Sequence, residues 1–357
     1  MSIDEQCFTS NPNFRFQEFV CEKSDCISAT YQFDCYKNKN DEIILVTHFF
    51  DNKRMLKQEY YISLINLNNN KLITKLEGHK DRITTVRYFQ NPLTKVEYLV
   101  SSDKKYNVIV WEISEKYEKI FEMKIIYKLF IYSCLLIFDD QKTWVVVSSV
   151  DSNNINKAIN INNKQEIIKI KDSQNLESYF LAYWHNYEIL EINQKHNIIQ
   201  CGKKKILIIE FPKNNIYFSF ESDEKYPNNL GAIVFKNNNR DILAVSASYG
   251  LVQILDLATK IIVKKIIFDN AHLYSFVKWN DRYLLLNDCR QRKIIVFDMK
   301  NDYEIKSKVL CPEMYFDRFI KKIVHPIYGE SILSIGTDWK IKLFVNRDIY
   351  FSRKKDK

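Results

Sequence analysis

Glycine and proline are scarce in this chain, with six of each among 357 residues. Every glycine is isolated, so the sequence contains no glycine-rich loop of the kind that cradles phosphate groups. The six histidines show no spacing typical of metal ligation or nucleophilic catalysis. We therefore predict a protein that is not an enzyme and has no catalytic, cofactor-binding or metal-binding residues.

The eight cysteines include no Cys-x-x-Cys pair, which disfavours a zinc ribbon or a small disulfide scaffold. We interpret them as reduced, mostly buried thiols; a zinc site from Cys21, Cys26, Cys35 and His48 is the less favoured alternative, because its spacing is irregular. The longest apolar run, residues 129–138, is shorter than the ~20 residues of a membrane helix, and the first residues do not resemble a secretory signal. We expect an intracellular protein without a membrane span, and the cytoplasm is the favoured compartment.

Apolar and aromatic residues are abundant, at 46% and 14% of the chain. Isoleucine, valine, tyrosine and phenylalanine favour the pleated, half-buried surfaces of sheets, so we expect an all-β protein. The formal net charge of +9 favours solubility and attraction to acidic partners, but carries no information about the fold.

Residues 71–114, KLITKLEGHKDRITTVRYFQNPLTKVEYLVSSDKKYNVIVWEIS, form the clearest copy of a repeated unit. The stretch resembles a WD-repeat blade. The resemblance rests on Gly78-His79 after a strand-like run, a second run at 82–89 ending in Asn91-Pro92, a third at 98–102, and a fourth at 108–111 followed by Glu112. Membership of that family implies four-stranded blades arranged around a channel.

The repeat can be followed through the residues expected in the third strand of each blade. Ile65, Trp111, Leu255, Phe297 and Phe344 recur at steps of 42 to 48 residues, when the interval from Trp111 to Leu255 is counted as three steps. Such a period across nearly the whole chain is typical of propellers. The sequence predicts a single seven-bladed β-propeller of four-stranded antiparallel blades.

We expect three segments: a flexible lead-in over 1–13, the propeller over 14–346, and a basic strand or tail over 347–357. A strand at 14–20 is predicted to join the last blade and close the ring. The first strand of blade one is expected at 27–33. Blade four is the least regular: its first strand is expected at 179–184, and 187–193 reads as a longer loop or a shifted strand.

In the WD-repeat family, a buried relay of His, Ser, Asp and Trp ties each blade together. By the resemblance, blade two supplies His79, Ser101 or Ser102, and Trp111. The family's Asp position, six residues before Trp111, holds Lys105, and Asp103 replaces it only if the turn is longer. Blade seven retains Asp338 and blade six retains His272, so we expect apolar packing to hold most blades.

The turns between second and third strands all emerge on one face of a propeller, and here they are rich in lysine and arginine. This predicted rim comprises Lys53, Arg54, Lys104, Lys105, Tyr106, Lys203, Lys204, Lys205, Arg290, Arg292, Lys293, Trp339 and Lys340. Tyr106 and Trp339 are the exposed-aromatic candidates that would anchor an interface. The alternative is that these are ordinary solvated turns of a lysine-rich chain.

We expect a non-enzymatic protein-interaction scaffold within a larger intracellular assembly, whose partners are other proteins. The alternative is a binder of RNA or another polyanion, such as DNA or an acidic protein segment, through the basic rim. The sequence does not identify the assembly.

Overall fold

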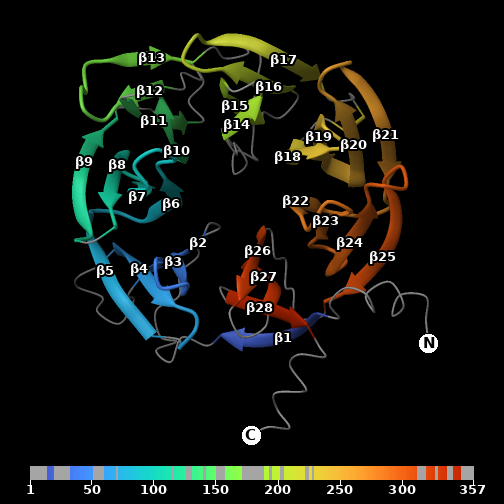
Figure 1. Cartoon of the computed structure of the whole chain (residues 1–357), viewed down its shortest axis with the longest axis horizontal. Coiled ribbons are helices and arrows are strands. Elements are labelled where there is room, and N and C mark those ends of the chain that lie inside the picture. Colours follow the sequence, from blue (N-terminus) through green and yellow to red (C-terminus); the bar gives the residue numbers. More distant parts are fainter. Residues whose placement is uncertain are drawn as a thin grey trace, which may run out of the picture.

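The computed structural model describes residues 14–19, 33–50, 60–69, 71–114, 116–125, 131–139, 142–149, 157–170, 189–192, 195–201, 205–221, 225–226, 229–311, 319–325, 329–335 and 341–346. These residues form seven antiparallel sheets of four strands each, arranged in a ring (Figure 1). The predicted fold class and the number of blades are therefore confirmed. In the described part of the chain, no helix is long and apolar enough to cross a membrane.

The first four blades follow one another along the chain, and each begins with its innermost strand (Figure 1). Blade one comprises β2 (Asp34–Lys37), β3 (Ile43–Phe50), β4 (Tyr60–Asn66) and β5 (Lys71–His79). Blade two comprises β6 (Ile83–Gln90), β7 (Glu97–Asp103), β8 (Asn107–Glu112) and β9 (Glu118–Lys124). Blade three comprises β10 (Ile131–Asp139), β11 (Lys142–Ser149), β12 (Lys157–Asn160) and β13 (Ile167–Lys169). Blade four comprises β14 (Ile189–Ile192), β15 (Lys195–Cys201), β16 (Lys205–Glu210) and β17 (Asn215–Glu221).

The last three blades complete the ring, and the seventh takes its outer strand from the N-terminal part of the chain. Blade five comprises β18 (Asn229–Asn237), β19 (Arg240–Ala247), the 3-10 turn η1 (Ser248–Gly250), β20 (Leu251–Asp256) and β21 (Ile261–Ile267). Blade six comprises β22 (Leu273–Lys278), β23 (Tyr283–Asp288), β24 (Lys293–Asp298) and β25 (Glu304–Leu310). Blade seven comprises β26 (Phe319–His325), β27 (Gly329–Ile335), β28 (Ile341–Asn346) and β1 (Phe14–Phe19), which pairs antiparallel with β28.

Apolar clusters fill the spaces between neighbouring blades, one at each of the seven junctions. Alternate side chains of one strand serve different junctions, because successive residues point to opposite faces of a sheet. In β3, Ile44 and Val46 face blade two, whereas Ile43 and Leu45 face blade seven. The middle strands are therefore buried on both faces, which explains why they read as continuous apolar runs.

The inner strands around the point of closure are tied by one carboxylate. Asp34 on β2 accepts a hydrogen bond from the backbone N–H of Tyr88 on β6 at 2.8 Å, and it forms an ion pair with Lys321 on β26. Lys321 also donates to the carbonyl of Cys35 at 3.1 Å. One buried acidic side chain thus joins blades one, two and seven, and the rings of Tyr36 and Tyr88 stack across the first of these junctions at 4.3 Å.

Close packing between blades also requires glycine at one position. A Cβ atom on Gly231, in the inner strand of blade five, would lie 1.7 Å from the carbonyl oxygen of Tyr274 in the inner strand of blade six. Only glycine allows the two backbones to approach this closely.

Five outer strands share a one-residue shift in register beside the third strand. The shift follows Leu64, Val110, Ile208, Ile254 and Val296 in the third strands. In four of the five blades the residue after the shift is one that marked the repeat in the sequence: Ile65, Trp111, Leu255 and Phe297. A bulge at the same place in five blades is a structural sign of the repeat.

Two expected strands need correction or qualification. The described first strand of blade one is β2, later in the chain than the predicted 27–33, of which 27–32 lie outside the described residues. β2 contains the buried polar contact of Asp34, which interrupts the apolar pattern used for the prediction. In blade four, β14 lies inside 187–193, so the shifted-strand alternative is correct. The predicted strand at 179–184 lies outside the described residues, as do 1–13 and 347–357.

Candidate functional site

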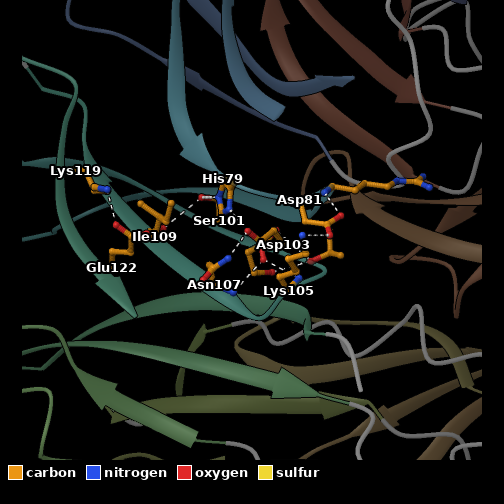
Figure 2. A network of polar contacts seen from close by, with 12 residues as sticks. His79, Asp81, Ser101, Asp103, Lys105, Asn107, Ile109, Lys119 and Glu122 are labelled. Carbon is orange, nitrogen blue, oxygen red and sulfur yellow. Dashed lines mark hydrogen bonds and ion pairs between the residues drawn. The ribbon is translucent and has the colours of Figure 1, made fainter. Parts of the chain in front are cut away.

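Four buried side chains of blades one and two form a hydrogen-bond relay, and Figure 2 labels three of them, His79, Ser101 and Asp103. His79 ends β5 and places Nδ1 3.0 Å from Asp103 Oδ2 and Nε2 2.8 Å from Ser101 Oγ. The indole N–H of Trp111 donates to the same Ser101 oxygen at 3.0 Å. The relay therefore ties the outer strand of blade one to the second and third strands of blade two.

Asp103, not residue 105, supplies the carboxylate of this relay. Its Oδ1 atom accepts the backbone N–H groups of Lys105 at 2.9 Å and Asn107 at 3.0 Å, and its Oδ2 atom accepts the Asn107 side chain at 2.8 Å. The turn is thus organised around Asp103, eight residues before Trp111. This is the longer turn that the sequence offered as the alternative.

The environment of Asp103 favours its ionised form. Burial raises the pKa of the carboxyl, but the hydrogen bonds from His79 and Asn107 outweigh burial and leave the pKa below its ordinary value. Lys105 lies at the surface and forms an ion pair with Asp81 at 3.5 Å (Figure 2).

Gly78 allows the indole ring to pack against the end of β5. A Cβ atom there would lie 3.2 Å from Trp111 Cη2, and Gly78 has a positive φ of 155°. The glycine and histidine before blade two therefore have separate tasks: Gly78 makes room for Trp111, and His79 joins the relay.

Blade six has an acidic residue at the corresponding turn but uses it differently, although the position six residues before Phe297 holds Gln291. Asp288 occupies the end of β23, as Asp103 occupies the end of β7, and is buried. It accepts the backbone N–H groups of His272, Arg290 and Gln291 at 3.1–3.2 Å. The His272 ring is exposed, so this residue contributes its main chain to the turn. Asp338 lies outside the described residues.

His48 lies on β3 and points to the same face of the strand as Ile44 and Val46. Both ring nitrogens are buried without a hydrogen-bond partner among the described residues. Burial, reinforced by Arg82 and His79, holds the pKa of the imidazole well below its ordinary value, so the ring is neutral near pH 7. Cys35 is a buried free thiol whose pKa burial raises to about 12, and Cys21 and Cys26 lie outside the described residues. Across the described ranges, no group of three His, Cys, Asp or Glu side chains is placed to hold a metal ion.

The predicted rim is only partly described. Lys53, Arg54, Lys203, Lys204, Trp339 and Lys340 lie outside the described residues. The remaining rim residues belong to blades two, four and six, which are not neighbours in the ring. The structure therefore brings them to one face but not into one contiguous patch. Lys205 forms an ion pair with Glu221 at 3.3 Å, and Lys293 donates to Gln291 at 3.4 Å.

Tyr106 differs from the exposed anchor that the sequence predicted. The backbone reverses at this residue, which has a φ of 69°, and the half-buried ring packs against the cluster between blades two and three. It therefore contributes to the core at that junction.

The two faces of the ring differ in charge. One carries the turns between second and third strands and the connections between blades, and we call it the basic face. Its described turns contain Lys80, Asp81, Arg82, Lys104, Lys105, Lys225, Asp269, Arg290 and Arg292. The described turns on the opposite face contain five acidic and eight basic residues, so their charges cancel more nearly than those of the basic face.

Comparison with solved structures finds the same architecture. The structure is similar to the β-propeller domain of Cps50 (Swd1) from Myceliophteria thermophila, with a TM-score of 0.62 over 93% of this chain and 99% of that chain. The two sequences are 11% identical, so the similarity shows the fold alone. No protein-family model matches the chain, and no curated protein matches its sequence.

Trp111 should dominate the stability of the relay. We expect Trp111→Ala to lower the free energy of unfolding by about 3–5 kcal/mol, because it leaves a cavity in a packed core. Trp111→Phe retains an aromatic ring but removes the N–H donor, and should cost about 1–2 kcal/mol. Denaturant unfolding of both variants measures the two values, and equal midpoints for Trp111→Ala and the parent chain would contradict the packing described here.

Asp103 should make stability depend on acid pH. The pKa of Asp103 is lower in the folded chain than in the unfolded chain. Its contribution to the free energy of unfolding is therefore fully present above the ordinary carboxyl pKa of about 4, and it is lost as the pH falls through the pKa of the folded chain. We expect Asp103→Asn to cost about 1.5–3 kcal/mol at pH 6. The difference in the free energy of unfolding between this variant and the parent chain should narrow below about pH 4. A gap that is constant from pH 6 to pH 3 would argue against an ionised Asp103 in the relay.

Proposed function

We propose that this chain is a divergent WD-repeat propeller that serves as a non-enzymatic protein-interaction scaffold within an intracellular assembly. The observation that carries the proposal is the relay of His79, Asp103, Ser101 and Trp111 in a closed ring of seven four-stranded blades. The similarity to another β-propeller domain supports the same reading of the fold. Propeller folds are typically non-enzymatic scaffolds.

The architecture suits a scaffold for a physical reason. The strands are fixed by apolar packing at all seven junctions, so residues in the surface turns vary without disturbing the ring. Turns from distant parts of the chain lie together on each face, which gives partner proteins broad and rigid surfaces to bind.

Binding of RNA or another polyanion by the basic face is the second candidate. The observation that favours it is the charge difference between the faces, because the described turns of the basic face contain only two acidic residues, Asp81 and Asp269. Phosphate binding by such a surface releases counterions and weakens steeply as salt is added.

One affinity-capture experiment separates the two candidates. The tagged full chain is purified from its source cells with and without nuclease, and bound proteins are identified by mass spectrometry. Protein partners that remain at stoichiometric amounts after nuclease are the result expected for a scaffold. Partners that disappear together with nucleic acid would overturn that proposal in favour of the second candidate.

Matched variants then locate the surface. Lys105→Gln with Arg290→Gln neutralises two exposed residues of the basic face, and Lys39→Gln with Lys300→Gln neutralises two exposed residues of the opposite face. If the second candidate holds, only the first pair should weaken binding of a 20-nucleotide single-stranded RNA and flatten its salt dependence. An equal effect of both pairs would show non-specific attraction to a basic protein.

A further inference from the structure

The outer strand of blade five, β21, has an edge that pairs with no described strand. Its other edge pairs with β20, and Figure 1 shows the strand on the outside of the ring. An unpaired edge presents backbone N–H and C=O groups that can bind a further strand. The outer strands of the other blades share this property, so the edge alone identifies no site.

Exposed apolar side chains distinguish β21 from the other outer strands. Ile261, Ile262, Val263 and Ile267 are 62%, 42%, 42% and 53% exposed. Among the strands whose side-chain exposure is described throughout, no other exposes as many large apolar side chains. The neighbouring outer strand, β25, adds Ile305 and Leu310. Exposed apolar surface of this extent is typical of an interaction site.

The charged residues of this edge all have the same sign. Lys260, Lys264 and Lys265 accompany the apolar residues, and residues 257–267 contain no acidic side chain. Lys264 forms an ion pair with Asp302 of blade six at 2.7 Å, whereas Lys260 is exposed in the turn before the strand. The edge therefore combines apolar contacts with positive charge, which favours a ligand that carries carboxylates.

The same lysines disfavour a second copy of this chain as the occupant. Antiparallel pairing of two β21 strands about their central residue would place Lys264 of one copy opposite Lys264 of the other, with each Lys265 one position away. Like charges directly opposite each other destabilise a strand pair. Edge lysines commonly prevent such self-pairing, but they do not repel an acidic strand.

We propose that the free edge of β21 binds an extended segment of a partner protein in which apolar residues alternate with aspartate or glutamate. The segment adds to blade five as a fifth strand, held by backbone hydrogen bonds, and its side chains contact the exposed isoleucines and lysines. The proposal rests on the scaffold function above and specifies a surface and a class of partner for it.

Synthetic peptides test the chemistry directly. The probes are a nine-residue peptide of alternating glutamate and valine, its lysine-for-glutamate counterpart, and a glutamate peptide with N-methyl groups on alternate amides. Fluorescence anisotropy with the full chain should show at least tenfold tighter binding of the unmodified glutamate peptide than of either other peptide. Hydrogen exchange should show that the peptide protects amides within residues 261–267.

Two charge-reversed variants provide the control. Lys260→Glu with Lys265→Glu should weaken binding of the glutamate peptide at least tenfold. Lys71→Glu with Lys75→Glu makes the same change on β5, the outer strand of blade one, and should alter binding less than twofold. Circular dichroism establishes that both variants fold.

The proposal is overturned if the glutamate and lysine peptides bind equally, if neither binds, or if both variants lose affinity alike. It is also overturned if the free edge of β21 is already protected in the chain alone, or if sedimentation shows dimers that depend on Lys260 and Lys265. These results would leave the scaffold proposal intact, because nuclease-resistant partners test that proposal separately.

Discussion

Burial of each sheet on both faces is the constraint on which the rest of this structure depends. In β11, Val145 and Val147 pack toward blade two, whereas Trp144 and Val146 pack toward blade four. A blade with only one neighbour would expose half of these side chains to water, at a cost of about 25 cal/mol for each Å² of apolar surface. The ring must therefore close, and the pairing of β1 with β28 completes the seventh blade.

Polar residues occur inside this framework where they hold turns and junctions together. Asp103 organises the turn of blade two and orients His79, and Asp288 accepts backbone N–H groups in the corresponding turn of blade six. Asp34 links three inner strands near the point of closure. Each carboxylate has several donors, as a buried charge requires. The blades thus share one pattern of apolar packing, but they differ in the hydrogen bonds that hold their turns.

The sequence predicted the ring well because the repeat was marked in five of the seven blades by buried apolar residues, such as Trp111 and Phe297. It failed where polar contacts between distant segments decide the structure. In the first strand of blade one, Asp34 contacts Tyr88 and Lys321 from distant parts of the chain, which no local pattern reveals. The run Ser101-Ser102-Asp103 was the available signal for the relay. The prediction instead looked for the acidic residue six positions before Trp111, where the chain has a lysine. The exposure of β21 was not predicted, since isoleucine-rich outer and inner strands look alike in sequence.

The described residues present two surfaces of different character: a basic face and an apolar outer edge. Both depend on a closed ring that holds them rigidly. The most direct test of that claim compares thermal unfolding of two shortened chains, one beginning at residue 14 and the other at residue 20, so that only the second lacks β1. The chain from residue 14 should unfold like the full chain, and the chain from residue 20 should unfold at a lower temperature in a broader transition. Superimposable curves for the two would contradict closure of the ring by β1.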